Sequence, residues 1–369
     1  MTDVSTGRQL SAAKQALLAQ RLRGRGAVAT IRARPAGVAP PLSFAQERLW
    51  FMEQMVPGSA AHTIPVALRL RGALDAGALE LALGDVADRH EALRMRYPAR
   101  EDGRPEVWVC EPDGLQLPLR VLSAGSADEA QDLVDAAIAE PFDLATGPVA
   151  RAALVRLADD DHVLALAVHH IACDGWSADI LLADLFALYE ARRGGRPPGL
   201  AGLPVQYGDY AIGQRDGLSG AADGDFAYWK RRLAALPTLD LVTDRPRPAE
   251  QTYEGTAHGF RLDAALTQSV RDLARRYDAT PYMVLLAGFQ ALLGRYAGQH
   301  DFAVGSPVAG RPLPELEPLV GCFVNLLTMR ADLSGRPSFA ALLDRVRAHR
   351  SKSISRTATK RRRLCRRSR

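Results

Sequence analysis

The sequence predicts an α/β protein whose helices pack on the sheets of two lobes. Its 369 residues are enough for two units of ordinary domain size. Segments with the spacing of amphipathic helices alternate with strand-like segments along the chain, and this mixed order is typical of helices packed on sheets. The sequence contains no run of about 18 apolar residues, so we expect no membrane-spanning helix and no membrane partner.

Caps and periodicity mark the elements of the first half. Ser43 and Gln46 form a capping-box pattern at the start of a helix. Residues 64–70 alternate apolar with polar or small side chains, as a half-buried strand does. Asp75 is expected to cap the next helix. Further strands are expected at residues 107–109, 153–155 and 163–168.

The second half repeats this alternation after two loop-like connections. Residues 194–199 are rich in Gly and Pro, and residues 236–248 form an extended connection by composition. A helix is expected over residues 281–293, with strands near residues 302–304 and 323–328.

Composition and charge exclude several classes of function. The four cysteines are scattered without a C-x-x-C spacing, which argues for the reducing cytoplasm and against a zinc site or a disulfide framework. The N-terminus lacks the apolar core of a signal peptide. Residues 351–369 carry nine Lys or Arg and no acid, and without them the net charge changes from +5 to −4. Because this tail has neither a folded scaffold nor aromatic side chains, we expect no nucleic-acid partner.

The run HHIACDGWS at residues 169–177 is the most informative part of the sequence. It follows an apolar strand, in which successive side chains point to opposite faces. One of His169 and His170 is therefore expected to face a cleft, while the other is held inside the domain. An Asp-Gly turn comes next, and Ser177 is the expected N-cap of the following helix.

Four further segments accompany this run in order. They read SFAQERLWF at residues 43–51, RHEALRMRY at 89–97, YGDYAI at 207–212 and VGCFVN at 320–325. Together with the pattern H-H-x-x-x-D-G, they resemble the motifs of nonribosomal peptide synthetase condensation domains, which belong to the chloramphenicol-acetyltransferase-like acyltransferases. Three positions depart from the family pattern: Met95 stands where Thr is usual, Ile212 where Val is usual and Gly213 where Trp is usual.

This resemblance implies a fold and an extent for each part. The family fold consists of two chloramphenicol-acetyltransferase-like lobes in a V-shaped pseudo-dimer with a tunnel between them. Residues 41–220 would form the first lobe, and residues 221–350 an incomplete second lobe, because the resemblance is expected to end there. Residues 1–40 would be an N-terminal helix and a linker or docking segment, or else a frayed terminus. Residues 351–369 would be a disordered or out-of-frame tail.

The resemblance also implies a chemistry. In a condensation domain, the amine of a downstream aminoacyl group attacks the thioester carbonyl of an upstream acyl group. His170 is the expected catalytic residue, because an imidazole titrates near the working pH. It would hydrogen-bond the amine, accept its proton or stabilise the tetrahedral intermediate. Gly175 lacks a Cβ, which permits a turn with positive φ and a close approach by a pantetheine arm, with the turn alone as an open alternative.

The remaining motif residues are expected to support this site. His169 faces the other way and is expected to pack inside the domain. Asp174 is expected to fix the loop through a salt bridge to Arg311 across the cleft. Two residues of the early helix are expected to be structural, namely Arg48 and Trp50. Three residues are assigned to substrate binding, namely Trp176, Ser177 and Asn325, the last with core packing as an open alternative.

The resemblance implies partners rather than a bound cofactor. No adenylation motif or carrier-type serine site is present, so upstream and downstream peptidyl carrier proteins would supply the phosphopantetheine arms, with other synthetase modules as further partners. The letters DGWS resemble the subtype that joins an L-configured donor to an L-configured acceptor. Two alternatives stay open: an inactive truncated fragment that only binds carriers, and an epimerisation domain.

Overall fold

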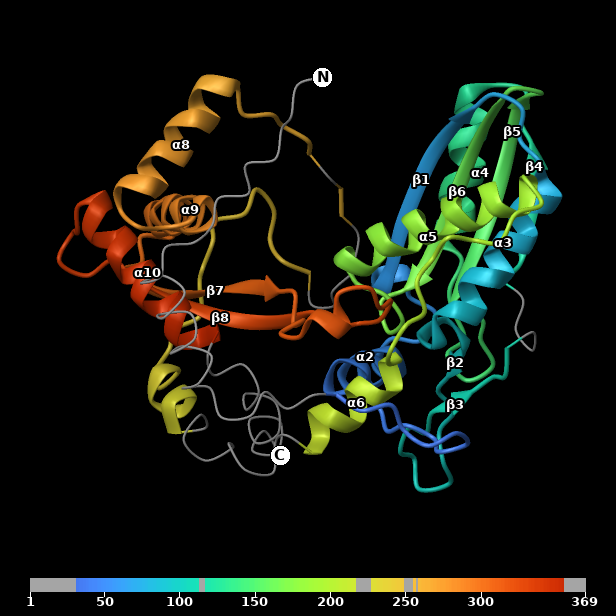
Figure 1. Cartoon of the computed structure of the whole chain (residues 1–369). Helices are drawn as coiled ribbons and strands as arrows, with labels where there is room; N and C mark the ends of the chain where they lie inside the picture. The colour runs from blue at the N-terminus through green and yellow to red at the C-terminus, as the bar shows by residue number, and fades with distance from the viewer. Residues whose placement is uncertain (1–30, 113–116, 217–226, 249–254, 257, 355–369) are drawn as a thin grey trace, which may run out of the picture.

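The computed structural model describes residues 31–112, 117–216, 227–248, 255–256 and 258–354, and Figure 1 shows them as two lobes. The predicted N-terminal helix lies outside the described residues, as do most of the basic tail and the predicted boundary at residue 220. No helix in the described part of the chain is long and apolar enough to cross a membrane.

The first lobe is built on a four-stranded sheet with the strand order β1-β6-β5-β4. Its strands are β1 (Thr63–Arg71), β4 (Leu119–Ser123), β5 (Ala150–Ala158) and β6 (Asp161–His169). Strand β6 pairs antiparallel with β1 and β5, whereas β4 and β5 pair in parallel. Most of β6 is buried, which confirms the apolar strand expected over residues 163–168 and places His169 at the strand end.

Helices cover both faces of this sheet (Figure 1). Helices α3 (Ala76–Arg89) and α5 (Gly175–Arg193) pack with Leu164, Leu166 and Val168 in the main core. Helix α4 (Ala127–Ala139) packs on the opposite face of the sheet. Its buried side chains form a separate apolar cluster with Ala165 of β6, which points away from the main core. The remaining elements of this half are α2 (Phe44–Met55), η1 (Ala60–His62), η2 (Glu91–Arg94), β2 (Met95–Arg96), β3 (Trp108–Val109) and α6 (Tyr207–Asp216).

Local capping explains where two of these helices begin. Ser43 and Gln46 form the predicted capping box of α2: the Ser43 hydroxyl accepts from the backbone N–H of Gln46, and the Gln46 side chain accepts from that of Ser43. The Asp75 side chain accepts from the N–H of Ala78 at the start of α3, as predicted.

The second lobe contains an antiparallel pair of strands, β7 (Asp301–Val308) and β8 (Asn325–Asp332). It also contains the helices α8 (Ala264–Arg276), α9 (Pro281–Ala297) and α10 (Phe339–Ile354), and the described residues 227–232 are also helical. The predicted helix over residues 281–293 is confirmed and is one turn longer. Helix α10 ends at Ile354, so it continues into the segment that was expected to have no helical pattern.

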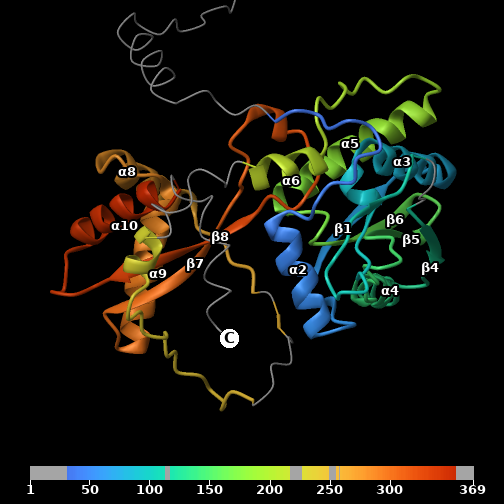
Figure 2. The same ribbon diagram turned by 90° about the horizontal axis from the view of Figure 1, so that it is seen from below.

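The segment between β7 and β8 leaves the second lobe and packs into the core of the first. It includes the short helix η3 (Pro314–Leu316). Its buried apolar side chains belong to the main core cluster of the first lobe, namely Leu316, Leu319, Val320, Cys322 and Phe323. Figure 2 shows this segment beside α5 and α6, far from α9 and α10. A single cut near residue 220 therefore does not separate the cores of the two lobes.

Candidate active site

The run at residues 169–177 lies where β6 ends and α5 begins. Asp174, not Ser177, is the N-cap of α5: its Oδ1 accepts from the backbone N–H of Ser177 at 2.8 Å. Gly175 is the first residue of the helix, and its φ is outside the left-handed region, so the positive φ that glycine permits is not adopted here. A Cβ placed on Gly175 would meet no atom within 4 Å, so the space beside this residue is open.

His169 is the inward-facing histidine of the pair. It is 1% exposed, and its Nδ1 accepts the backbone N–H of Ile171 at 3.0 Å. A neutral ring must then carry its proton on Nε2, which lies 3.5 Å from Glu53 Oε2. Burial lowers the pKa of His169, and the histidine contacts hold the pKa of Glu53 low in spite of burial. Both shifts favour a neutral imidazole that donates to an ionised carboxylate.

Glu53, His62 and His169 form the one group of potential metal ligands found among the described residues, with ligand atoms within 4.8 Å of one another. The tautomer of His169 argues against a metal, because its Nε2 carries the ring proton while Nδ1 accepts from the backbone. A metal bound at Nε2 would require an imidazolate ring. The His62 Nδ1 lies 3.4 Å from the same Glu53 oxygen, so the three side chains form a hydrogen-bonded support.

His170 is the outward-facing histidine. It is partly exposed, and its backbone N–H donates to the carbonyl of His62 at 2.7 Å. The ring Nδ1 lies 3.7 Å from Cys322 Sγ, in the segment between β7 and β8. Within the part of the chain that the structure describes, Nε2 has no partner and is free to meet a ligand. The predicted division between one buried and one accessible histidine is therefore present.

Asp174 connects the run to the segment between β7 and β8. Its Oδ2 accepts the backbone N–H groups of Phe323 at 2.9 Å and Val324 at 3.1 Å. Its Oδ1 accepts the Ser177 hydroxyl at 2.7 Å, in addition to the capping bond. We call these contacts, with those of Arg311 to Asp174 and Ser177, the Asp174 network. It joins the start of α5 to chain about 150 residues further on.

Arg311 is the cation of this network, as predicted. Its Nη2 lies 3.4 Å from Asp174 Oδ1, and both side chains are almost fully buried at 2% and 3% exposure. The same nitrogen donates to the Ser177 hydroxyl at 2.6 Å. The guanidinium also lies 3.9 Å from the centroid of the Phe323 ring. Burial lowers the pKa of Arg311 while Asp174 opposes this shift, so the buried cation depends on its carboxylate.

Tyr207 makes a second connection to the same segment. Its hydroxyl donates to the Cys322 carbonyl at 2.7 Å and lies 2.8 Å from the Ser43 hydroxyl. Burial raises the pKa of Tyr207 well above its usual value, so the phenol stays a donor. A Cβ on Gly321 would lie 2.0 Å from the Tyr207 ring, so only glycine fits there.

The other predicted site residues divide into exposed and buried groups. Trp176 is half exposed beside the run and can meet a ligand. Ser177 was assigned to substrate binding but is fully buried inside the Asp174 network, and Asn325 is buried at the start of β8. Trp50 is structural, since its Nε1 donates to the Tyr97 carbonyl at 3.0 Å. Arg48 is exposed on α2.

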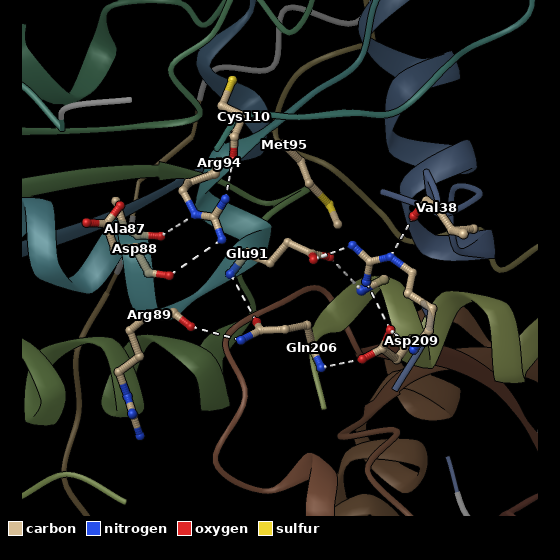
Figure 3. Close-up of polar contacts among 12 residues, drawn as sticks. Val38, Ala87, Asp88, Arg89, Glu91, Arg94, Met95, Cys110, Gln206 and Asp209 are labelled. Atoms are coloured by element: carbon tan, nitrogen blue, oxygen red, sulfur yellow. Dashed lines mark hydrogen bonds and ion pairs between the residues drawn. The ribbon is translucent and has the colours of Figure 1, made fainter. Parts of the chain in front are cut away.

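An ion cluster that the sequence did not indicate anchors the entering chain. Arg34 binds Asp209 Oδ1 through Nη1 at 2.9 Å and pairs with Glu91 through Nη2. Figure 3 shows Glu91, Gln206 and Asp209 converging at this point. Because Arg34 is isolated in a Pro-rich segment, no spacing pattern could have identified it. Glu53, on α2, and Cys322, at the variable position of a recognised motif, were also missed, because His169 and His170 lie 116 and 152 positions away from them.

Comparisons with known proteins agree with this geometry. A family model described as "Condensation domain" matches residues 39–368, which runs past residue 350, where the resemblance was expected to end. A linear gramicidin synthase chain of Brevibacillus parabrevis is 46% identical over 312 residues, which are 83% of this chain and 6% of that protein. Phosphinothricin tripeptide synthetase PhsC of Streptomyces viridochromogenes is 42% identical over 348 residues, which are 92% of this chain and 32% of that protein. The chain thus spans less than a third of the length of these curated relatives.

Solved structures show the same fold. The X-domain from teicoplanin biosynthesis superposes with a TM-score of 0.80 at 30% identity, covering 89% of this chain and 74% of that one. The first condensation domain of the calcium-dependent antibiotic synthetase, in complex with a substrate analogue, gives a TM-score of 0.74 at 27% identity, covering 88% and 75%. With the family match over most of its length, this chain belongs to the condensation-domain family of nonribosomal peptide synthetases.

Proposed function

We propose that this chain forms an amide bond between an upstream acyl or peptidyl thioester and a downstream aminoacyl thioester. Both groups would be carried on phosphopantetheine arms of separate carrier proteins. The observation that carries the proposal is His170, whose Nε2 is free within the described residues, on a loop held by the buried Asp174 network. The names of the relatives, which include a tripeptide synthetase, support this reaction class.

The reaction needs positioning and proton handling more than activation. The amine nitrogen attacks the thioester carbonyl, forming a C–N bond and a tetrahedral intermediate. His170 Nε2 accepts the proton that the amine loses. Collapse of the intermediate breaks the C–S bond, and the proton passes to the departing pantetheine thiolate. Atoms and charge balance in these steps with the two thioesters and the imidazole alone.

Neighbouring residues act through His170 or on the bound groups. The open space beside Gly175 admits a pantetheine arm, and the half-exposed Trp176 is the residue we assign to contact with the acyl groups. Asp174 and Arg311 position the loop, since both are buried away from any ligand. By the resemblance of its DGWS letters, the chain would act on L-configured donors and acceptors, in the cytoplasm.

The test is single-turnover condensation by the full chain with two carriers loaded with defined thioesters. His170→Ala should lower the rate by roughly 10²–10⁴-fold, which is the usual contribution of a positioned acid or base. His300→Ala is the matched control, because His300 is exposed in the second lobe, far along the chain from the run. Equal rates for the His170→Ala variant and the unchanged chain would refute the proposal.

A second candidate is a binding platform without turnover. The X-domain from teicoplanin biosynthesis, in its complex with OxyB, superposes on this chain with a TM-score of 0.81, and that complex favours a protein-binding role for this fold. This candidate predicts that loaded carriers bind the chain, that no amide forms, and that His170→Ala leaves the affinity unchanged. Deuterium washout from a single loaded carrier would instead indicate an epimerisation domain.

A further inference from the structure

Cys322 is a buried thiol in contact with the proposed catalytic histidine. Its side chain is 1% exposed, and its Sγ lies 3.7 Å from His170 Nδ1. Two constraints hold it there: the Tyr207 hydroxyl donates to its carbonyl, and the N–H of the next residue, Phe323, donates to Asp174. The thiol is therefore carried by a firmly held stretch of the segment between β7 and β8.

We propose that Cys322 is a positioning residue that sets the tautomer of His170, its sulfur accepting the ring proton at Nδ1. This inference rests on the proposed function, in which Nε2 must accept the proton of the amine. In a neutral imidazole, the partner of one nitrogen decides which nitrogen carries the proton. A thiol sulfur is a weak acceptor, but it is the one partner that Nδ1 has among the described residues.

The neighbouring His169 gives a comparison for the tautomer of His170. His169 Nδ1 accepts the N–H of Ile171, so its ring proton is on Nε2. The two adjacent histidines would then hold opposite tautomers, His169 with its proton on Nε2 and His170 with its proton on Nδ1. Each tautomer suits its role, because His169 donates to Glu53 while His170 presents an unprotonated Nε2.

Several ionisable groups that surround the Cys322 thiol are either neutral or paired in charge. Burial raises the pKa of Tyr97, Tyr207 and Cys173, so all three stay neutral near pH 7. The fixed charges of the adjoining network, Asp174 and Arg311, are paired with each other. A thiol can accept from Nδ1–H or donate to an unprotonated Nδ1, and we infer the first arrangement because the proposed function needs an unprotonated Nε2.

The experiment is imidazole ¹⁵N–¹H correlation NMR on the full chain labelled at histidine, with His170→Ala used to assign the His170 signals. We expect the His170 proton on Nδ1 and the His169 proton on Nε2. Cys322→Ala should move the His170 proton to Nε2, whereas Cys322→Ser, which keeps an acceptor, should not. Cys173→Ala is the matched control, since this buried thiol contacts the Asp174 carbonyl and should leave His170 unchanged.

Condensation kinetics provide an independent reading. Cys322→Ala should lower kcat on the order of tenfold, a part of what a positioned base supplies, with KM changed by less than about twofold. A His170 proton on Nε2 in the unchanged chain overturns the inference, and so does an unchanged tautomer in Cys322→Ala. If His170→Ala condenses normally, the proposed function fails, while the spectra still decide the tautomer. If Cys322→Ala does not fold, the unchanged chain still tests the inference, because a His170 proton on Nε2 there overturns it.

Discussion

Replacing Asp174 should destabilise the chain far more than the loss of one surface charge. Asp174 and Arg311 are 3% and 2% exposed, and the carboxylate accepts two backbone N–H groups from the segment between β7 and β8. Asp174→Ala leaves the Arg311 cation and these two donors without their acceptor. Breaking a buried pair of this kind costs about 3–5 kcal/mol. That is a large share of the roughly 5–15 kcal/mol that stabilises a typical domain.

Urea unfolding monitored by tryptophan fluorescence measures this loss as a shift of the midpoint at constant m-value. Asp174→Asn keeps the shape but removes the charge, and it should lie between the Ala variant and the unchanged chain. The matched control is Glu140→Ala, since the Arg120–Glu140 pair is 54% and 41% exposed and should contribute less than about 1 kcal/mol.

A double-mutant cycle tests the cause. If the unpaired cation is the main penalty, Arg311→Met combined with Asp174→Ala should cost less than the sum of the two single changes. The reasoning is refuted if Asp174→Ala costs less than about 1 kcal/mol. It is also refuted if the double variant shows full additivity, because the charge of Arg311 would then be irrelevant.

Three further changes probe the rest of the framework. Gly321→Ala should lower the free energy of unfolding by about 1–3 kcal/mol in the same assay, because its Cβ would overlap a buried tyrosine ring. Gly288→Ala, in open space on α9, should instead raise it by up to about 1 kcal/mol. Equal effects of the two changes would contradict this. Arg34→Met should lower the free energy of unfolding by about 3 kcal/mol and speed amide hydrogen exchange in residues 31–42. Unchanged exchange would show that the ion cluster does not anchor this segment. Burial lowers the pKa of His90 and His169, so below about pH 6.5 the unfolded chain binds up to about two more protons than the folded chain. The unfolding free energy should then fall as the pH falls, by up to about 2.7 kcal/mol per pH unit, and denaturation midpoints that are flat between about pH 7.5 and 5.5 would contradict this.

Local features of the fold were predictable because their causes are local. The capping box at Ser43, the Asp75 cap and the apolar strand at residues 163–168 depend on residues within a few positions of one another. The start of α5 was placed wrongly because Asp174 and Ser177 are both good N-cap residues, and spacing alone does not choose between them. The network explains the outcome: Ser177 Oγ is bonded to Asp174 and to Gly321, so only the carboxylate is left to cap the helix.

The crossing of the segment between β7 and β8 was not predictable from periodicity. Phe323 and Val324 have the apolar character of a strand, and a strand was expected to begin there. Instead β8 begins at Asn325, because the two preceding N–H groups are taken by the Asp174 carboxylate and not by β7. The competition is between a ladder hydrogen bond and a charge-assisted bond, which is the stronger of the two. A partner about 150 positions away decides it, so no sequence window contains the answer.

This arrangement changes what the run at residues 169–177 means for activity. The two histidines and the Asp-Gly turn lie in the first lobe. Asp174 contacts Phe323, and His170 contacts Cys322, only when the segment between β7 and β8 is in place. A chain can therefore carry the complete run and still hold His170 in the wrong orientation or tautomer. Substitutions at Cys322 or Gly321 should separate the presence of the run from the correct placement of His170. They disturb the segment between β7 and β8 while leaving every residue of the run intact. In this chain, residues 321–324 therefore belong to the proposed site as much as the run itself does.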